Sequence, residues 1–345
     1  MNVRLAQWIR QRPLRRGIVL ACAALVLAAG VSNLAGYVRF RHFADALDRS
    51  LATEPTGRTT DVSWSFPFES GRPMVTVALD EAEIEAAAAL DTSAVFGSRG
   101  WLRDAYVARL IAAEAASPVV GRLVAEFRRI RHERGLDDDR YLELMTTAVQ
   151  SIPYGEVTGE IMLPAEMLAT GSGVCTEKSV LLAAVLVHEG YDTVLWVFPT
   201  QRHVALGVRS DGARFGDTPY AFVETTVDAF VGQSEASFRS SGPIVRPPRQ
   251  IALGGWRAYG AGRQVELILA ELGRAESITA STDRYTRWAT LGGTHGSRYA
   301  ERANEHWAAS TTAAFILGNT HDRRDVYAIL AAGGVPDAGS PQLLL

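Results

Sequence analysis

The sequence predicts an α+β protein in which a buried helix packs on an antiparallel sheet, with helical flanking regions and one N-terminal transmembrane helix. Three observations lead to this prediction. An uncharged apolar run covers 17–38. The stretch VLLAAVLV at 180–187 is apolar on every face, which is typical of a buried helix. Three short strand-like runs with short links follow it, as in an antiparallel meander.

The N-terminal apolar run predicts a membrane anchor. The segment GIVLACAALVLAAGVSNLAGYV at 17–38 has 22 residues and no charge, enough to cross a bilayer as a helix. Seven arginines and no acidic residues occupy 1–43, five of them before the run. The positive-inside rule predicts a single-pass cell-membrane protein with a cytoplasmic N-terminus, and with the residues from about 44 onward in the periplasm or outside the cell. A cleaved signal peptide is the alternative, which the length of the run disfavours.

The charge of the remaining chain excludes nucleic acid as a partner. Beyond residue 43 there are 28 basic and 38 acidic side chains, a formal charge of −10. Nucleic-acid binding requires a basic face. A peptide or protein substrate fits this composition better.

The membrane-proximal region, residues 44–140, is predicted to hold a β-hairpin and several helices. The alternating stretch 59–79 is broken by a turn at 69–73, which is typical of a hairpin. Helical spacing follows in the segments 80–90, 101–116 and 118–134, and again from the charged patch 137–140 to the residue before Pro153.

The central region, residues 141–233, is predicted to be the catalytic core. A loop covers 151–174, and a helix then runs from about 175 to 189 and ends at Gly190. The three strand-like runs follow at 193–198, 203–208 and 221–226.

The C-terminal region, residues 234–345, is predicted to be a linker followed by helices. The segment 234–254 is polar and contains prolines, which favours a linker or an extended arm. Helical spacing covers 262–333, and the tail after it is expected to be loose.

A single cysteine in the exported part indicates a working thiol. Cys22 lies in the apolar run, which leaves Cys175 alone at the start of the buried helix. The unpaired N–H groups and the positive end of that helix stabilise a thiolate, and the same groups can hold an oxyanion. Gly171 and Gly173 allow a sharp turn into the helix. The cysteine count excludes a thiolate metal site, no HExxH pair occurs, and no cofactor is implied.

The best candidate for the base is His203, which opens a predicted strand 28 residues after Cys175. The predicted helix leads the chain away from Cys175, and a strand after it leads the chain back, so that His203 can lie near the cysteine. His188 lies thirteen residues along the helix, about 20 Å away. A carboxylate should orient the imidazole. We choose Glu224, because a carboxylate inside the apolar run YAFVETT requires a partner, with Asp217 as the alternative.

These motifs resemble the transglutaminase-like superfamily of papain-type folds, in particular its membrane-anchored or exported bacterial and archaeal members. The resemblance lies in the order of GSGVCTEKSVLLAAVL, RHVALGV and YAFVETT, with VQSIPYG and LPAEMLATGSG upstream, and it covers 141–226. It implies Cys175 as nucleophile, His203 as base and Glu224 as orienting acid, where many members have aspartate.

Four supporting residues have open roles. Gln150 is a candidate oxyanion donor by analogy with the papain glutamine, although the Cys175 N–H is favoured. Lys178, the only lysine beside 34 arginines, either holds the helix start or the loop 165–173, or lies exposed. Tyr154 and Trp196 either line an acyl site or, as we prefer, pack in the core.

The expected function is that of a thiol hydrolase that cuts a peptide or amide bond through a Cys175 thioester. A protein-glutamine acyltransferase uses the same thioester with an amine acceptor, and a catalytically idle binding or assembly module is the third possibility. No EF-hand calcium loop is visible in the sequence.

Overall fold

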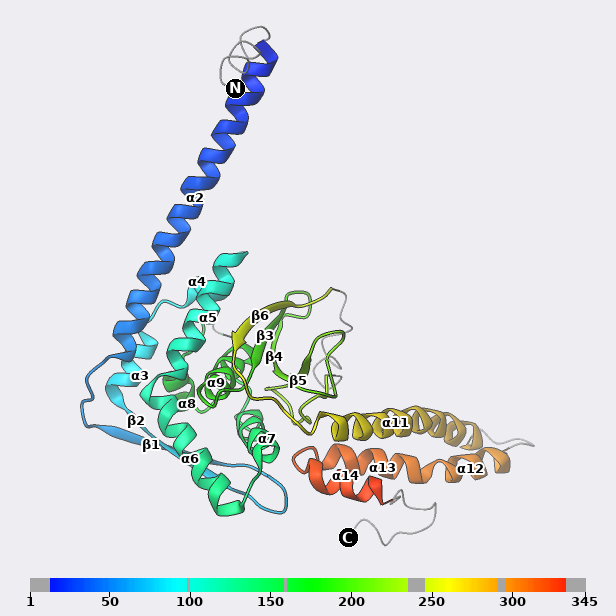
Figure 1. Cartoon of the computed structure of the whole chain (residues 1–345). Coiled ribbons are helices and arrows are strands. Elements are labelled where there is room, and N and C mark those ends of the chain that lie inside the picture. Colours follow the sequence, from blue (N-terminus) through cyan, green and yellow to red (C-terminus); the bar gives the residue numbers. More distant parts are fainter. Residues whose placement is uncertain (1–12, 98–99, 158–159, 235–245, 291–295, 333–345) are drawn as a thin grey trace.

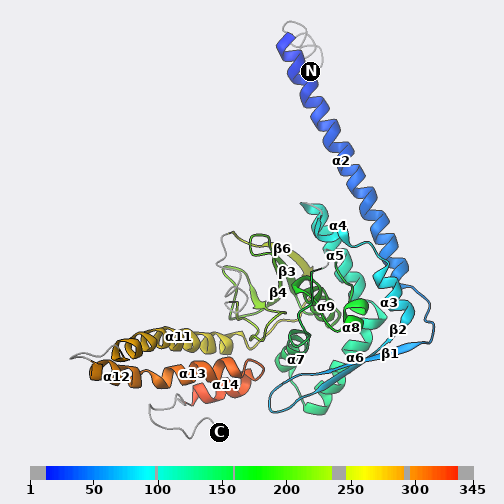
Figure 2. The ribbon, with the colours of Figure 1, turned by 180° about the vertical axis from the view of Figure 1, so that it is seen from behind.

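The computed structural model describes residues 13–97, 100–157, 160–234, 246–290 and 296–332. It is a mixed α+β protein with two antiparallel sheets. A long N-terminal helix rises from one side of the central body, and a helical arm extends from the other (Figure 1). The view from behind shows the same separation of stalk, body and arm (Figure 2).

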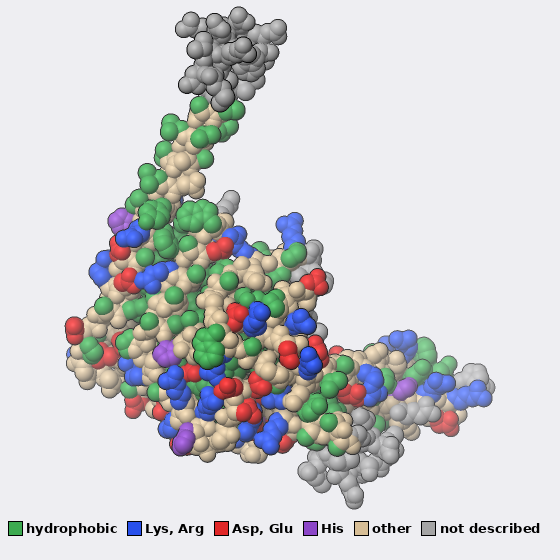
Figure 3. Space-filling view, viewed as in Figure 1, with side chains coloured by type: hydrophobic (Ala, Val, Ile, Leu, Met, Phe, Trp, Pro, Cys, Tyr) green, Lys and Arg blue, Asp and Glu red, His purple; other side chains and the backbone are tan. Residues whose placement is uncertain are grey.

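The long helix α2 (Pro13–Leu51) has two different halves. From Ala21 onward it is long and apolar enough to cross a membrane, by length and composition. Leu25 is 70% exposed, and hydrophobic side chains cover this part of the stalk in Figure 3. Near the end of the helix, Phe43 and Leu47 are buried, and the Phe43 ring meets the Tyr106 ring edge-on. The last turns of α2 therefore belong to the core of the body.

The predicted hairpin is confirmed. Strands β1 (Thr59–Ser65) and β2 (Met74–Asp80) pair antiparallel, with Val62 opposite Val77. The Asp80 side chain then caps helix α3 (Glu81–Ala88). A short helix, α4 (Ser93–Gly97), follows; the sequence patterns did not predict it.

Three helices surround the site region at the positions that their spacing predicts. Ser117 caps α6, whose first residue is proline, and Asp137 caps α7. Their bounds are α5 (Trp101–Ala115), α6 (Pro118–Arg134) and α7 (Asp138–Gln150).

A buried carboxylic acid lies at the end of α5. Glu114 is 2% exposed, and the Ser117 side chain is hydrogen-bonded to it. Burial raises the pKa of Glu114 to about 7, although the Ser117 hydrogen bond opposes this shift. The folded protein therefore keeps this side chain protonated at pH values at which the unfolded chain ionises it.

Because the pKa is raised on folding, the Glu114 contribution to stability is complete below about pH 4.5 and is lost as the pH rises to about 7. We expect Glu114→Gln, which cannot ionise, to gain about 2 to 3 kcal/mol in free energy of unfolding relative to the wild type between pH 5 and pH 8. Urea unfolding of both full-length proteins in detergent measures this difference. Parallel pH dependences of the two proteins would contradict it.

The second sheet has the strand order β5-β4-β3-β6, and all its pairs are antiparallel. The predicted meander of three strands is confirmed. Helix α9 (Cys175–His188) packs between this sheet and helices α5, α6 and α7. The strand bounds are β3 (Thr193–Phe198), β4 (His203–Arg209), β5 (Tyr220–Val223) and β6 (Arg249–Gly254).

The structure corrects two expectations about loops. The segment 234–254, expected to be a linker or an extended arm, is not only a linker: it contributes β6, which pairs Ile251 with Leu195 at the edge of the sheet. Ile251 is the one buried residue of β6, so the strand lacks the alternation of apolar and polar residues by which strands are predicted. The loop 151–174 contains helix α8 (Pro164–Thr170). Proline at its start and the left-handed Gly171 after its end are the usual signals of so short a helix.

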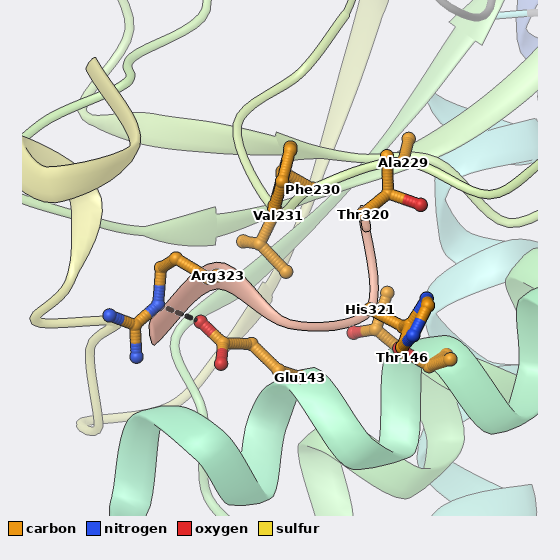
Figure 4. A pocket seen from close by; sticks show the side chains of 9 residues that line it. Glu143, Thr146, Ala229, Phe230, Val231, Thr320, His321 and Arg323 are labelled. Atoms are coloured by element: carbon orange, nitrogen blue, oxygen red, sulfur yellow. Dashed lines mark hydrogen bonds and ion pairs between the residues drawn. The ribbon is translucent and has the colours of Figure 1, made fainter. Parts of the chain in front are cut away.

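The C-terminal arm is helical, as predicted, and it is fastened to α7. Arg323, 6% exposed, forms an ion pair with Glu143 (Figure 4). The Glu143 carboxylate also accepts a 2.5 Å hydrogen bond from the Tyr259 hydroxyl. The tail 333–345 lies outside the described residues. The helices are α11 (Gly262–Thr290), α12 (Gly296–Glu305), α13 (Trp307–Gly318) and α14 (Arg323–Ala331).

One hydrophobic core joins most of these elements. It extends from Phe43 to Val326 and includes side chains of all three regions beyond the predicted anchor. A smaller cluster covers the other face of the second sheet, where Trp196 packs against Phe215 and Phe222. The core therefore holds α9 rigidly against the sheet, which fixes the position of Cys175.

Candidate active site

Cys175 is the first residue of α9, and a glutamate fixes the turn that leads into it. The Glu177 carboxylate accepts hydrogen bonds from the N–H groups of Val174 (2.8 Å) and Met162 (3.1 Å). Gly173 donates its N–H to the Pro153 carbonyl at 3.0 Å, and a Cβ there would lie 2.6 Å from the Met167 sulfur. A larger residue at Gly173 would have to displace the Met167 side chain, so the glycine lets the chain turn closely into α9.

The surroundings of Cys175 favour the thiolate. Burial raises the pKa of this thiol, since its residue is 8% exposed. The hydrogen bond and charge of His203, the N–H of Val204 and the Thr176 side chain outweigh that effect and hold the pKa below its ordinary value. The thiol is therefore more readily ionised than an ordinary cysteine.

His203 connects the thiol to a carboxylate. It opens β4, and its Nε2 lies 3.2 Å from Oε2 of Glu224, which leaves Nδ1 for the thiol. Burial lowers the pKa of His203, but its bonds to Cys175 and Glu224 raise it to about 9. These bonds favour the imidazolium form of His203 at neutral pH, and the imidazolium in turn favours the thiolate of Cys175.

Glu224 is fully buried and fixed from behind. It follows directly after β5, one residue beyond the end of that strand. Its Oε1 accepts hydrogen bonds from the N–H of Thr225 (2.9 Å) and from the N–H (2.7 Å) and hydroxyl (2.6 Å) of Thr226. Burial raises its pKa, but the bonds to His203 and Thr226 hold it below the ordinary value. Glu224 is thus an ionised acceptor for the imidazolium.

Gln150 does not take the oxyanion position that the papain analogy suggests. Its Nε2 donates 3.0 Å hydrogen bonds to the main-chain carbonyls of Glu224 and Ala229. Both amide hydrogens are therefore directed at the main chain that carries the acid. Gln150 is a positioning residue, and its partner lies 74 residues away in the sequence.

Lys178 is fully buried, so the alternative of an exposed side chain is wrong. Its Nζ donates to the carbonyls of Gln150 (3.0 Å) and Ile152 (2.6 Å), at the C-terminus of α7, and not to the loop 165–173. Burial lowers its pKa to about 8, while the charges of Glu224 and Asp228 oppose the shift. A cation there satisfies carbonyls that the helix end leaves unpaired.

The other sequence candidates lie elsewhere. Asp217 is exposed in the turn before β5, and Glu224 fills the acceptor position. His188, at the far end of α9, has Nδ1 2.7 Å from the Ala115 carbonyl oxygen. Among the described residues, no group of three His, Cys, Asp or Glu side chains is arranged to hold a metal ion.

Tyr154 is not a core residue, contrary to our expectation. It is 58% exposed, and burial and the charge of Cys175 raise the pKa of its hydroxyl, which places the hydroxyl near the thiol. The motif VQSIPYG, which contains Tyr154, is part of the family resemblance. A single tyrosine in a loop does not, however, predict a contact with the cysteine.

No family model, no curated protein and no solved structure matches the chain. Any functional conclusion therefore depends on the geometry of the site.

Proposed function

We propose that the protein is a membrane-anchored thiol hydrolase that cleaves a peptide or amide bond through a thioester on Cys175. The observation that carries this proposal is the arrangement of Cys175, His203 and Glu224. Nε2 of His203 lies 3.2 Å from Oε2 of Glu224, and His203 lowers the pKa of the Cys175 thiol against the effect of burial. Nucleophile, base and orienting acid come from a helix start, a strand start and a strand end, in the order typical of the transglutaminase-like superfamily.

Each of the three residues has its own role in the proposed reaction. The Cys175 thiolate attacks the carbonyl carbon, and the charge moves to the carbonyl oxygen. The His203 imidazolium then gives its proton to the leaving amine, and the carbon–nitrogen bond breaks to leave a thioester. Neutral His203 takes a proton from water, which attacks the thioester and releases the acid. Glu224 holds the ring and stabilises the imidazolium throughout.

The stalk supports a membrane location. The exposed apolar half of α2 and the arginines around it favour a single pass with a cytoplasmic N-terminus and the body outside. Because Phe43 and Leu47 enter the core of the body, the helix connects the membrane to the domain without a flexible link. Such a tether favours a membrane or cell-wall substrate over a diffusing one.

The test is acylation by p-nitrophenyl acetate, which requires no knowledge of the natural substrate. We expect the full-length protein in detergent to release a burst of one p-nitrophenolate per chain, to carry an acetyl group on the Cys175 peptide and to turn over slowly. Cys175→Ala should lose the burst, and Cys22→Ala should keep it.

Two further outcomes decide between the functional classes. If added glycinamide takes the acetyl group in preference to water, the protein is an acyltransferase. If the wild type forms no acetyl-enzyme, the site is idle, and the protein is a binding module.

A further inference from the structure

The loop that carries Tyr154 is tied to the turn before Cys175. Gly173 donates its N–H to Pro153, and Gly155 donates its N–H to the Gly173 carbonyl at 3.2 Å, so that Tyr154 and Gly173 form a parallel bridge. A Cβ on Gly155 would lie 3.2 Å from the Gly173 nitrogen. This approach brings Tyr154 beside a residue that stands two positions before the nucleophile.

The Tyr154 hydroxyl lies near the thiol of Cys175. Burial raises the pKa of this hydroxyl, and the charge of Cys175 raises it further, so the two groups are close enough to interact. The Cys175 N–H is an unpaired donor at the start of α9, where the oxygen of an attacked carbonyl has to bind. The ring is 58% exposed, so a substrate approaching from solvent meets it first.

The geometry points to Tyr154 as the side-chain donor of the oxyanion site: its hydroxyl and the Cys175 N–H bind the oxygen of the carbonyl that Cys175 attacks. This inference rests on the proposed function. It replaces Gln150, whose amide hydrogens are directed at the Glu224 and Ala229 carbonyls.

A rotation of the hydroxyl accounts for both states of the site. Before attack the negative charge is on sulfur, and the O–H group donates to it. As the sulfur–carbon bond forms, the charge moves to the carbonyl oxygen, and the O–H group turns toward it without giving up its proton. Burial and the negative thiolate raise the pKa of Tyr154, which keeps the hydroxyl protonated at neutral pH.

The test compares a reaction that forms an oxyanion with one that does not. p-Nitrophenyl acetate acylates Cys175 through an oxyanion, whereas iodoacetamide alkylates the same sulfur at a saturated carbon. Rate constants are measured on full-length protein in detergent, at the alkaline plateau of each pH profile, where the thiol is ionised. We expect Tyr154→Phe to slow acylation about 10²-fold and to change alkylation less than about threefold. Tyr327→Phe, in the remote helix α14, should change neither.

Each other outcome overturns the inference in a distinguishable way. A rise in both rate constants would make Tyr154 a plug over the thiol. An equal fall in both would make it a support of the thiolate alone, and no change would leave it without a part in the reaction. If the wild type is alkylated but forms no acetyl-enzyme, the proposed function itself fails.

Discussion

Replacing His203 by alanine is expected to move the titration of Cys175 upward and to stop acyl transfer. In the wild type the imidazolium holds the thiol pKa below its ordinary value, and the ion pair persists until His203 loses its proton near pH 9. Without the imidazole only burial, the Val204 N–H and the Thr176 side chain act on the thiol. We expect the variant thiol to titrate at or above about 8.5, and acetylation at pH 7 to fall about 10²- to 10⁴-fold.

The pH dependence of iodoacetamide alkylation between pH 4 and pH 10 measures this shift. His188→Ala is the matched control, because that histidine lies at the opposite end of the same helix and contacts the Ala115 carbonyl. Coincident profiles for wild type and His203→Ala would show that the two side chains do not form a pair.

Replacing Glu224 by glutamine is expected to remove acyl transfer while leaving the fold intact. Three donors from Thr225 and Thr226 converge on Oε1, so the amide oxygen of the variant occupies that position. Its NH₂ group then faces Nε2 of His203 and forces this nitrogen to accept a hydrogen bond. Nε2 then carries no proton, so the ring is neutral with its single proton on Nδ1, where it cannot take a proton from the thiol. The imidazolium is lost, and acetylation should fall about 10³- to 10⁴-fold.

Asp217→Asn is the matched control for the acid. Asp217 lies in an exposed turn and does not contact the imidazole. The acetylation rate of the Asp217→Asn variant should therefore equal that of the wild type. The melting temperature of Glu224→Gln, measured by near-ultraviolet circular dichroism, separates lost chemistry from lost structure. A Glu224→Gln enzyme with full acetylation activity would remove the carboxylate from the mechanism.

The sequence predicts the parts of this site that local patterns encode. Cys175 is marked by the glycines before it and the apolar helix after it. Glu224 is marked because a carboxylate interrupts an apolar run, and the structure places it against His203. In each case a few neighbouring residues of the sequence indicate the physical requirement, which is a helix start for Cys175 and a partner for a buried charge for Glu224.

The remaining parts depend on distant contacts. Gln150 meets Glu224 across 74 residues, and no local pattern distinguishes this role from that of an oxyanion donor. Strand β6 has one buried residue, Ile251, because it lies at the edge of its sheet, so it lacks the alternation that reveals a strand. The position of Tyr154 depends on its main-chain bridge to Gly173, and no sequence pattern predicts that bridge.

The single lysine has a consequence for the chemistry of the whole molecule. An acyltransferase with lysine acceptors risks coupling to its own copies when they crowd together on a membrane. Here 34 arginines accompany one lysine, and the only side-chain amine, on Lys178, is fully buried and bonded to the Gln150 and Ile152 carbonyls. Neighbouring copies therefore offer one another no lysine to crosslink while they are folded. The same amine becomes available to acylating dyes only when the site opens, which makes it a built-in reporter of local unfolding.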